Sequence, residues 1–97
     1  MIVAKFKVNR FEMAQYPKQI DPAKGWGQDN LEIVEQRTIF ASPVYGNGDP
    51  NHENTKFWNA SPTGELRLGV INKEAWPEFE LGQEYYVYFS KDKLQGV

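Results

Sequence analysis

Short runs of alternating apolar and polar residues recur along this chain, and turn-forming residues separate them. Residues 2–9 alternate in this way, and residues 31–40 do so with many β-branched side chains. Successive side chains of a β-strand point to opposite faces of the sheet, so each run predicts a strand with one buried face. Residues 66–70 and 84–90 predict two further strands.

Turn chemistry separates these predicted strands. Residues 16–30 contain prolines and glycines and are expected to form a long loop. Asp49 followed by Pro50 is typical of a helix start, with Asp as the N-cap and Pro at the first helical position, so a short helix over residues 51–59 is predicted. A second helical turn is expected immediately before Pro77, which stops it.

These elements predict a mainly β (α+β) protein with a small antiparallel sheet, or a partly open barrel, and one or two short helices. Residues 1–97 are expected to form a single domain, because 97 residues of which 40% are hydrophobic can fill only one core. The last strand carries Tyr86 and Tyr88 on one face and Tyr85 and Phe89 on the other. It is therefore expected to be central, or covered on both faces.

The aromatic content is high for so short a chain, with six Phe, five Tyr and three Trp. A two-layer core needs fewer, so some of these side chains are expected to face a ligand or another subunit. Five lie at positions that a sheet core would use, namely Phe6, Phe40, Phe79, Tyr85 and Phe89.

Charge and cysteine content exclude several classes of function. Eleven basic and thirteen acidic residues give a formal charge of -2, whereas proteins that follow a long phosphate backbone carry a basic stripe. No long nucleic acid is expected as a partner. The chain has no cysteine, which fits a reducing cytoplasm. Neither an apolar signal-peptide stretch nor a run of roughly 20 apolar residues is found, so no membrane association is expected.

Catalytic and metal-binding patterns are weak. Residues 47–53 carry oxygen ligands at every second position, as a calcium loop begins, but His52 and Trp58 stand where an EF-hand needs Gly and Glu. His52 is the only histidine, and the chain has no nucleophile elbow, P-loop or dinucleotide fingerprint. We therefore expect no catalytic residues, no metal site, no cofactor and no enzymatic activity.

The stretch from residue 43 to residue 67 is the densest in groups that bind ligands. It combines flat aromatic rings, side-chain amides, hydroxyls and two cations, which are the groups that stack a base, read its edge and hold phosphate. A small nucleotide needs only a couple of cations, so the acidic net charge does not argue against it. The alternative is that Phe57 and Trp58 fill the core while residues 61–64 make a turn. The candidate binding residues are Tyr45, Asn54, Lys56, Phe57, Trp58, Ser61, Thr63 and Arg67.

Five motifs of this chain carry a resemblance to a known group of proteins. They are Pro43-Val44-Tyr45-Gly46, Glu53-Asn54, Lys56-Phe57-Trp58, Ala60-Ser61-Pro62-Thr63-Gly64-Glu65-Leu66 and Leu81-Gly82-Gln83-Glu84-Tyr85-Tyr86-Val87. With them the chain resembles a widespread group of small phage and prophage proteins of uncharacterised type, over roughly residues 1–10 and 31–90. Residues 16–30 look like an insertion. The group is similar to the phage anti-CBASS sponges, small oligomeric proteins that sequester cyclic nucleotide immune signals without cleaving them.

The resemblance implies a homo-oligomer in the host cell cytoplasm, with pockets between subunits that hold a small nucleotide. Two alternatives stay open: a phage structural or accessory protein of the virion or replication machinery, and an OB-like binder of single-stranded nucleic acid. For a nucleotide, chemistry assigns stacking to Tyr45 and Trp58. Phosphate contacts then fall to Lys56 and Arg67, and base or ribose contacts to Asn54, Ser61 and Thr63.

Overall fold

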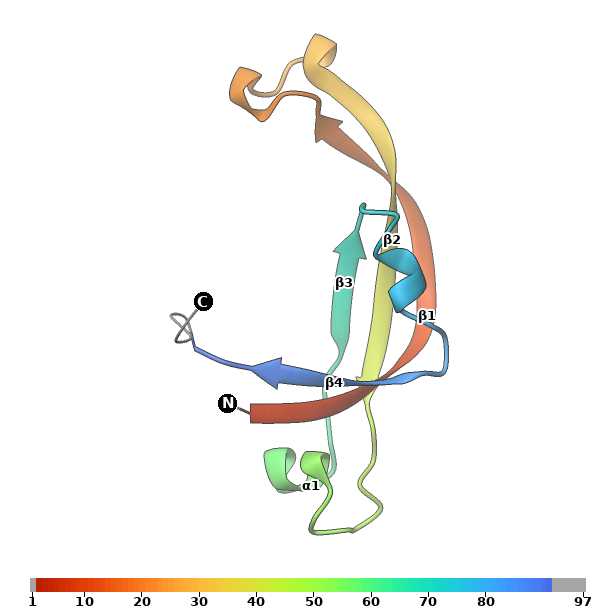
Figure 1. The fold of residues 1–97 in the computed structure, drawn as a ribbon, viewed down its shortest axis with the longest axis vertical. Coiled ribbons are helices and arrows are strands. Elements are labelled where there is room, and N and C mark those ends of the chain that lie inside the picture. The colour runs from red at the N-terminus through yellow and green to blue at the C-terminus, as the bar shows by residue number, and fades with distance from the viewer. Residues whose placement is uncertain (1, 92–97) are drawn as a thin grey trace.

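Four antiparallel strands form one open sheet in the computed structural model, which describes residues 2–91 (Figure 1). The order across the sheet is β3-β2-β1-β4. This confirms the predicted mainly β (α+β) class with a small antiparallel sheet. The strands are β1 (Ile2–Gln19), β2 (Leu31–Pro43), β3 (Leu66–Val70) and β4 (Glu84–Phe89), and the helical segments are α1 (Glu53–Trp58) and the 3-10 turns η1 (Pro22–Lys24), η2 (Gln28–Asn30) and η3 (Trp76–Glu78).

A β-bulge divides β1 into two parts. Val8 lies opposite Ala41 and Arg10 lies opposite Phe40, so Asn9 is an extra residue between two consecutive partners. Because side chains alternate along a strand, one extra residue moves the apolar face from even-numbered to odd-numbered positions. Phe11 thus packs against the same core as Val8.

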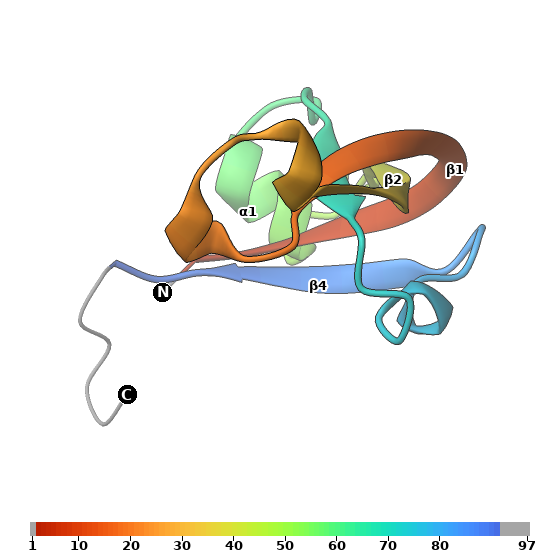
Figure 2. The same ribbon diagram turned by 90° about the horizontal axis from the view of Figure 1, so that it is seen from above.

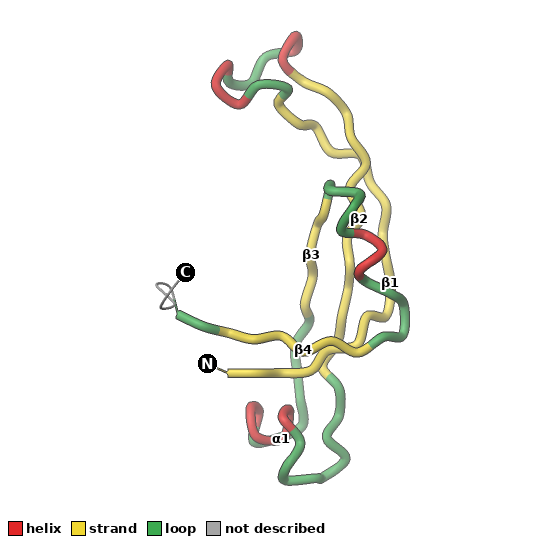
Figure 3. Tube along the Cα trace, viewed as in Figure 1, coloured by secondary structure: helices red, strands yellow, loops and turns green. Residues whose placement is uncertain are grey.

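Beyond the bulge, β1 and β2 continue past the other two strands as a projecting arm (Figures 1 and 3). Their pairing runs out to Gln19 and Leu31, whereas β3 pairs with β2 only as far as Arg37. The predicted long loop over residues 16–30 is therefore wrong for residues 16–19, which are in β1. Each strand of a two-stranded arm has a free edge, and a proline such as Pro17 is tolerated there.

The Asn30 side chain makes three of the hydrogen bonds that hold the tip of the arm together. Asn30 is buried, and its Oδ1 accepts a hydrogen bond from the Asp21 N–H at 2.9 Å. Its Nδ2 donates to the carbonyl oxygens of Asp21 at 2.8 Å and Gly25 at 2.6 Å. Trp26 beside this network is 69% exposed. The tip is thus an ordered turn that presents a large apolar ring outward.

The core lies on one face of the sheet, where β1 pairs with β2 on either side of the bulge. Ala4, Phe6, Val8, Ile39 and Ala41 form its buried centre. Among the predicted core aromatics, Phe6 is buried there, and Phe79 and Tyr85 pack against it. Phe40 is buried on the opposite face, where the Arg10 guanidinium stacks 3.8 Å from its ring centroid.

The predictions for the last strand are wrong in two respects. Among residues 2–91, β4 is an edge strand that pairs only with β1, so it is not central, and Tyr86 and Tyr88 are 50% and 62% exposed. Phe89, predicted to be in the core, is 46% exposed and stacks on the Phe57 ring at 6.2 Å. One face of β4 packs Tyr85 and Val87 against the core, and the other face leaves Tyr86 and Tyr88 exposed, so the aromatic pattern does not reflect burial on both faces.

The remaining turns also differ in detail from the sequence prediction. Pro77 does not stop the helical turn before it but lies inside η3, at a position near the helix start where proline is tolerated. No helix within residues 2–91 is long and apolar enough to cross a membrane.

Candidate functional site

The predicted binding residues follow the end of β2, where the chain leaves the sheet, forms a loop and enters α1 (Figure 1). Asn54 attaches this segment to β1. Its Oδ1 accepts from the Lys5 N–H and its Nδ2 donates to the carbonyls of Lys5 and Val44, each at 2.7 Å. β2 ends opposite Phe6, and beyond it the Val44 N–H still donates to the Lys5 carbonyl at 3.0 Å, so the Asn54 amide supplies the partners of the Lys5 N–H and the Val44 carbonyl. Asn54 is fully buried and has no polar atom free for a ligand.

The start of α1 also differs from the prediction. The helix begins at Glu53 instead of residue 51, and its N-cap is His52, whose Nδ1 accepts from the Asn54 N–H at 3.0 Å. Asp49, predicted as the cap, accepts from the Asn51 N–H at 2.9 Å and closes the preceding turn. The single histidine of the chain thus has a structural role.

Trp58 packs against the core. Its ring packs edge-on against Phe6 with centroids 6.1 Å apart and against Phe57 at 4.6 Å. Its Nε1 donates to the Thr63 carbonyl at 2.9 Å, which satisfies the only polar atom of the ring. The core-filling alternative therefore describes Trp58, and the Thr63 side chain stays exposed at the surface.

Tyr45 is more exposed than Phe57, the other exposed aromatic of this region. It is 63% exposed and lines two hollows of about 340 and 310 Å³. Asn47 lines both hollows as well. Ligand pockets in proteins start at about 300 Å³, so each hollow is large enough for part of a nucleotide.

Amides and hydroxyls surround Tyr45 on both sides. The first hollow contains Asn9 and Ser42, whose side chains are joined by a 2.6 Å hydrogen bond. The second contains Thr55, Asn59 and Ser61. Of the predicted binding residues, the structure thus brings Tyr45 and Ser61 together.

The loop can lie this close to α1 because residue 46 has no side chain. A Cβ atom at Gly46 would collide with Thr55 Oγ1. Asn47 and Asn59, on either side of the second hollow, both have the left-handed backbone that asparagine tolerates better than most residues. The hollow therefore depends on these residue types.

The two predicted phosphate-binding cations are elsewhere. Lys56 lines a separate hollow of about 400 Å³ together with Ile2 and Phe57. Arg67 lies on β3, with its guanidinium 6.0 Å from the Phe40 ring. Lys7 of β1 lines the first of the two Tyr45 hollows. Nothing in the local sequence pairs Lys7 with Tyr45; the two residues line the same hollow because Lys7 lies opposite Ser42 in the sheet.

A charged network connects α1 to β4 near the same place. Lys5 Nζ lies 3.4 Å from Glu84 Oε1 and 5.0 Å from the Tyr86 ring centroid. Burial alone would lower the pKa of Lys5, but Tyr86 and Glu84 outweigh burial and raise it. The backbone N–H at the start of α1 and the Tyr86 hydroxyl lower the pKa of Glu53, helped by His52 and Lys5. Both groups are charged at neutral pH.

Comparison of the chain with family models, curated proteins and solved structures found no match. Within the described part of the chain, no group of three or more His, Asp or Glu side chains is placed to hold a metal ion. The candidate site is therefore defined by its geometry alone, as two hollows that share Tyr45 and Asn47. We call it the Tyr45 site.

Proposed function

We propose that this chain is a phage-encoded, non-catalytic binding protein that captures a small nucleotide at the Tyr45 site. The observation that carries the proposal is an exposed aromatic ring between two hollows whose polar lining groups are amides, hydroxyls, one lysine and the Glu84 carboxylate. Aromatic rings stack bases of every kind, amides hydrogen-bond their edges, and an ammonium group with a hydroxyl holds phosphate. The resemblance to phage anti-CBASS sponges supports a cyclic oligonucleotide as the ligand and the host cytoplasm as its location.

In this proposal the base stacks on Tyr45, the Asn47 and Asn59 amides contact its edge, and Lys7 with Ser42 holds phosphate. This replaces the roles predicted for Lys56, Arg67, Asn54 and Trp58, whose side chains lie in other surroundings. Glu84 also lines the hollow of Lys7, and its pairing with Lys5 reduces its repulsion of an anion.

We further propose that copies of the chain associate. Both hollows are open to solvent on one side, so one chain covers a ligand incompletely, and pockets completed by a second subunit would bind it more tightly. Large exposed apolar side chains on β4 and on the arm supply surface for such contacts.

The test is a panel of cyclic di- and trinucleotides in thermal unfolding and calorimetric titration. We expect one or more to raise Tm, and we expect the ligand to be recovered intact after heat denaturation of the protein. Tyr45→Ala should weaken binding about 5-fold or more, because base stacking on an aromatic ring contributes about 1–3 kcal/mol. Tyr16→Ala, which removes an exposed tyrosine of the arm, is the matched control. No shift with any nucleotide, or equal binding by the two variants, would contradict the proposal.

The second candidate is a phage structural or accessory interaction protein. The arm favours it, because Met13, Ile20, Trp26 and Ile33 are all exposed there. Mass spectrometry of purified virions tests whether the chain is a structural protein of the phage particle. Absence of the chain from particles would exclude that role. The third alternative, an OB-like binder, lacks structural support, since an OB-fold is a five-stranded barrel and this sheet is open with four strands.

A further inference from the structure

The outer edge of β4 is free of any neighbouring strand among residues 2–91. β4 pairs with β1 on one side and is the last strand of the sheet (Figure 2). An edge strand presents a row of backbone N–H and C=O groups that another strand can use. The question is which residues of β4 present those groups.

The hydrogen bonds of β1 show which β4 residues direct their backbone groups outward. Val8 donates to the Gln83 carbonyl at 3.0 Å and accepts from the Gly82 N–H at 2.8 Å, so its backbone groups face β4. Those of Lys5 face the other way, toward Val44 and Asn54. Since backbone groups alternate along a strand, Ala4 and Phe6 face β4 and bond their partners Val87 and Tyr85. Tyr86 and Tyr88 therefore direct their backbone N–H and C=O groups outward.

This edge lacks the protection that edge strands usually have. Residues 85–89 contain no charge, no proline and no glycine, and all five are aromatic or β-branched. The opposite edge of the sheet differs, because β3 carries Arg67 and Gly69 at its outward positions and the Gln36 amide fills the space above Gly69. Natural sheets blunt free edges with charges, prolines or bulges, and a bare edge of high β-propensity pairs with another strand.

We propose that β4 pairs with β4 of a second copy of this chain, antiparallel about a two-fold axis at Val87. A two-fold axis normal to the sheet requires directly opposite residues to lie on the same face. With the axis at Val87, Tyr86 lies opposite Tyr88 of the second copy, and both present the outward backbone groups that the pairing needs. Tyr85 lies opposite Phe89 of the second copy on the other face.

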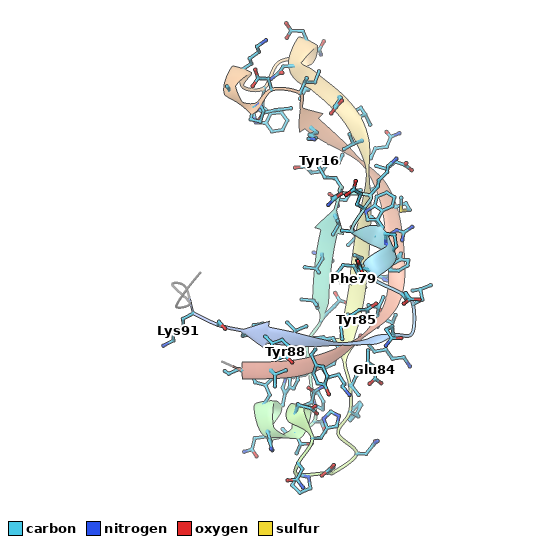
Figure 4. All side chains as sticks on the ribbon, in the orientation of Figure 1. Tyr16, Phe79, Glu84, Tyr85, Tyr88 and Lys91 are labelled. Carbon is cyan, nitrogen blue, oxygen red and sulfur yellow. The ribbon has the colours of Figure 1, made fainter. Side chains whose placement is uncertain are left out.

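The strand is self-complementary in this register, which is why a second copy is the occupant. Both faces of the junction consist of aromatic cross-strand pairs, which are among the most stabilising pairs in antiparallel sheets. Glu84 lies opposite Ser90 and Gln83 opposite Lys91 of the second copy, so no like charges meet. Figure 4 shows Glu84 and Lys91 at the two ends of this segment with Tyr88 between them.

The pairing joins two four-stranded sheets into one of eight strands. It also brings together the apolar hollows of about 470 Å³ on the core faces of the two copies, each lined by side chains that include Phe6, Leu68 and Val87. This inference rests on the proposed association of copies and is independent of the nucleotide.

A single cysteine tests the two-fold axis, because the chain has no other cysteine. In the proposed dimer, Val87 lies opposite Val87 of the second copy as a non-hydrogen-bonded pair. The Cα atoms of such a pair are about 4.5 Å apart, within disulfide range. Under mild oxidation Val87→Cys should form a disulfide-linked dimer on non-reducing gels. Leu68→Cys is the matched control, since Leu68 is a half-exposed apolar residue on the core face of the other edge strand. Equal cross-linking of the two variants would overturn the proposal.

The unmodified protein provides the second measurement. Light scattering with size-exclusion chromatography should show a dimer, and amide hydrogen exchange should protect Tyr86 and Tyr88 as well as Tyr85 and Val87. In a monomer only the amides that face β1 are protected. A monomer at high concentration would overturn both the association and this interface. An oligomer with fast exchange at Tyr86 and Tyr88 would overturn the β4 interface alone, and neither result bears on nucleotide binding.

Discussion

At the scale of single residues, the strongest prediction concerns Asn54. Its amide bonds the Lys5 N–H and the carbonyls of Lys5 and Val44, and the Lys5 carbonyl also accepts from the Val44 N–H. Asn54→Ala therefore leaves two part-buried groups without partners, the Lys5 N–H and the Val44 carbonyl. Each such group costs about 1–3 kcal/mol. We expect the free energy of unfolding to fall by about 2 kcal/mol or more, measured by urea denaturation monitored by circular dichroism.

The control for Asn54 is Asn51→Ala, because Asn51 is exposed in the turn just before α1. That variant should change the free energy of unfolding by less than about 0.5 kcal/mol, as surface substitutions usually do. Equal effects of the two substitutions would show that the Asn54 amide does not attach α1 to β1.

Glu53 predicts a pH dependence of stability at the same scale. Its backbone N–H, the Tyr86 hydroxyl and the neighbouring His52 and Lys5 lower its pKa from 4.5. A carboxyl whose pKa is lower in the folded state stabilises the fold above its unfolded pKa, and that stabilisation is lost as the pH falls through the folded value. The Tm of the protein should therefore fall below about pH 4.5. In Glu53→Gln the part of the fall in Tm that comes from protonation of Glu53 should be absent. A pH profile of Tm equal to that of the unmodified protein would contradict the role given to Glu53.

At the scale of elements, the arm should be separable from the rest of the fold. Within residues 16–34 only Asn30 is buried, and its partners Asp21 and Gly25 belong to the same tip. Replacing residues 16–34 by Asn-Gly joins Gln15 to Glu35, which already lie opposite each other, through a turn suited to a hairpin.

We expect this shortened chain to keep cooperative thermal unfolding and nucleotide binding while its radius of gyration falls in small-angle scattering. The full-length chain is the reference. Loss of cooperative unfolding would mean that the arm supports the core, and loss of binding with the fold retained would place the arm in the ligand site.

At the scale of the whole molecule, the chain is extended. Its radius of gyration is 17.6 Å and its axes are 56 × 33 × 21 Å, whereas a compact domain of 100 residues has a radius of gyration of about 13 Å. The described residues include only six buried apolar side chains, and four of the larger exposed ones belong to β4 or its neighbour Ile2. A small core with an extended surface gains stability from association, which agrees with the interface proposed for β4.

Local pattern alone predicted a good part of this fold. Period-two alternation located β1, β2 and β3, because the facing of side chains in a strand depends only on sequence neighbours, and the turn at residues 81–83 located the start of β4. Turn residues located the breaks between strands and the short helix, to within a few residues. The stretch that contains the Tyr45 site was also evident, since it concentrates amides, hydroxyls and aromatic rings.

Tertiary structure decided which of those residues lie together. The bulge at Asn9, the edge position of β4 and the approach of Lys7 to Tyr45 all depend on pairing between segments far apart in the chain. Asn54 and Trp58 have the chemistry of ligand contacts, yet Asn54 bonds the backbone of Lys5 and Val44, and Trp58 packs against Phe6 of the core. Sequence neighbours determine how a strand faces, but strand order and register are set by long-range contacts that a local pattern does not encode.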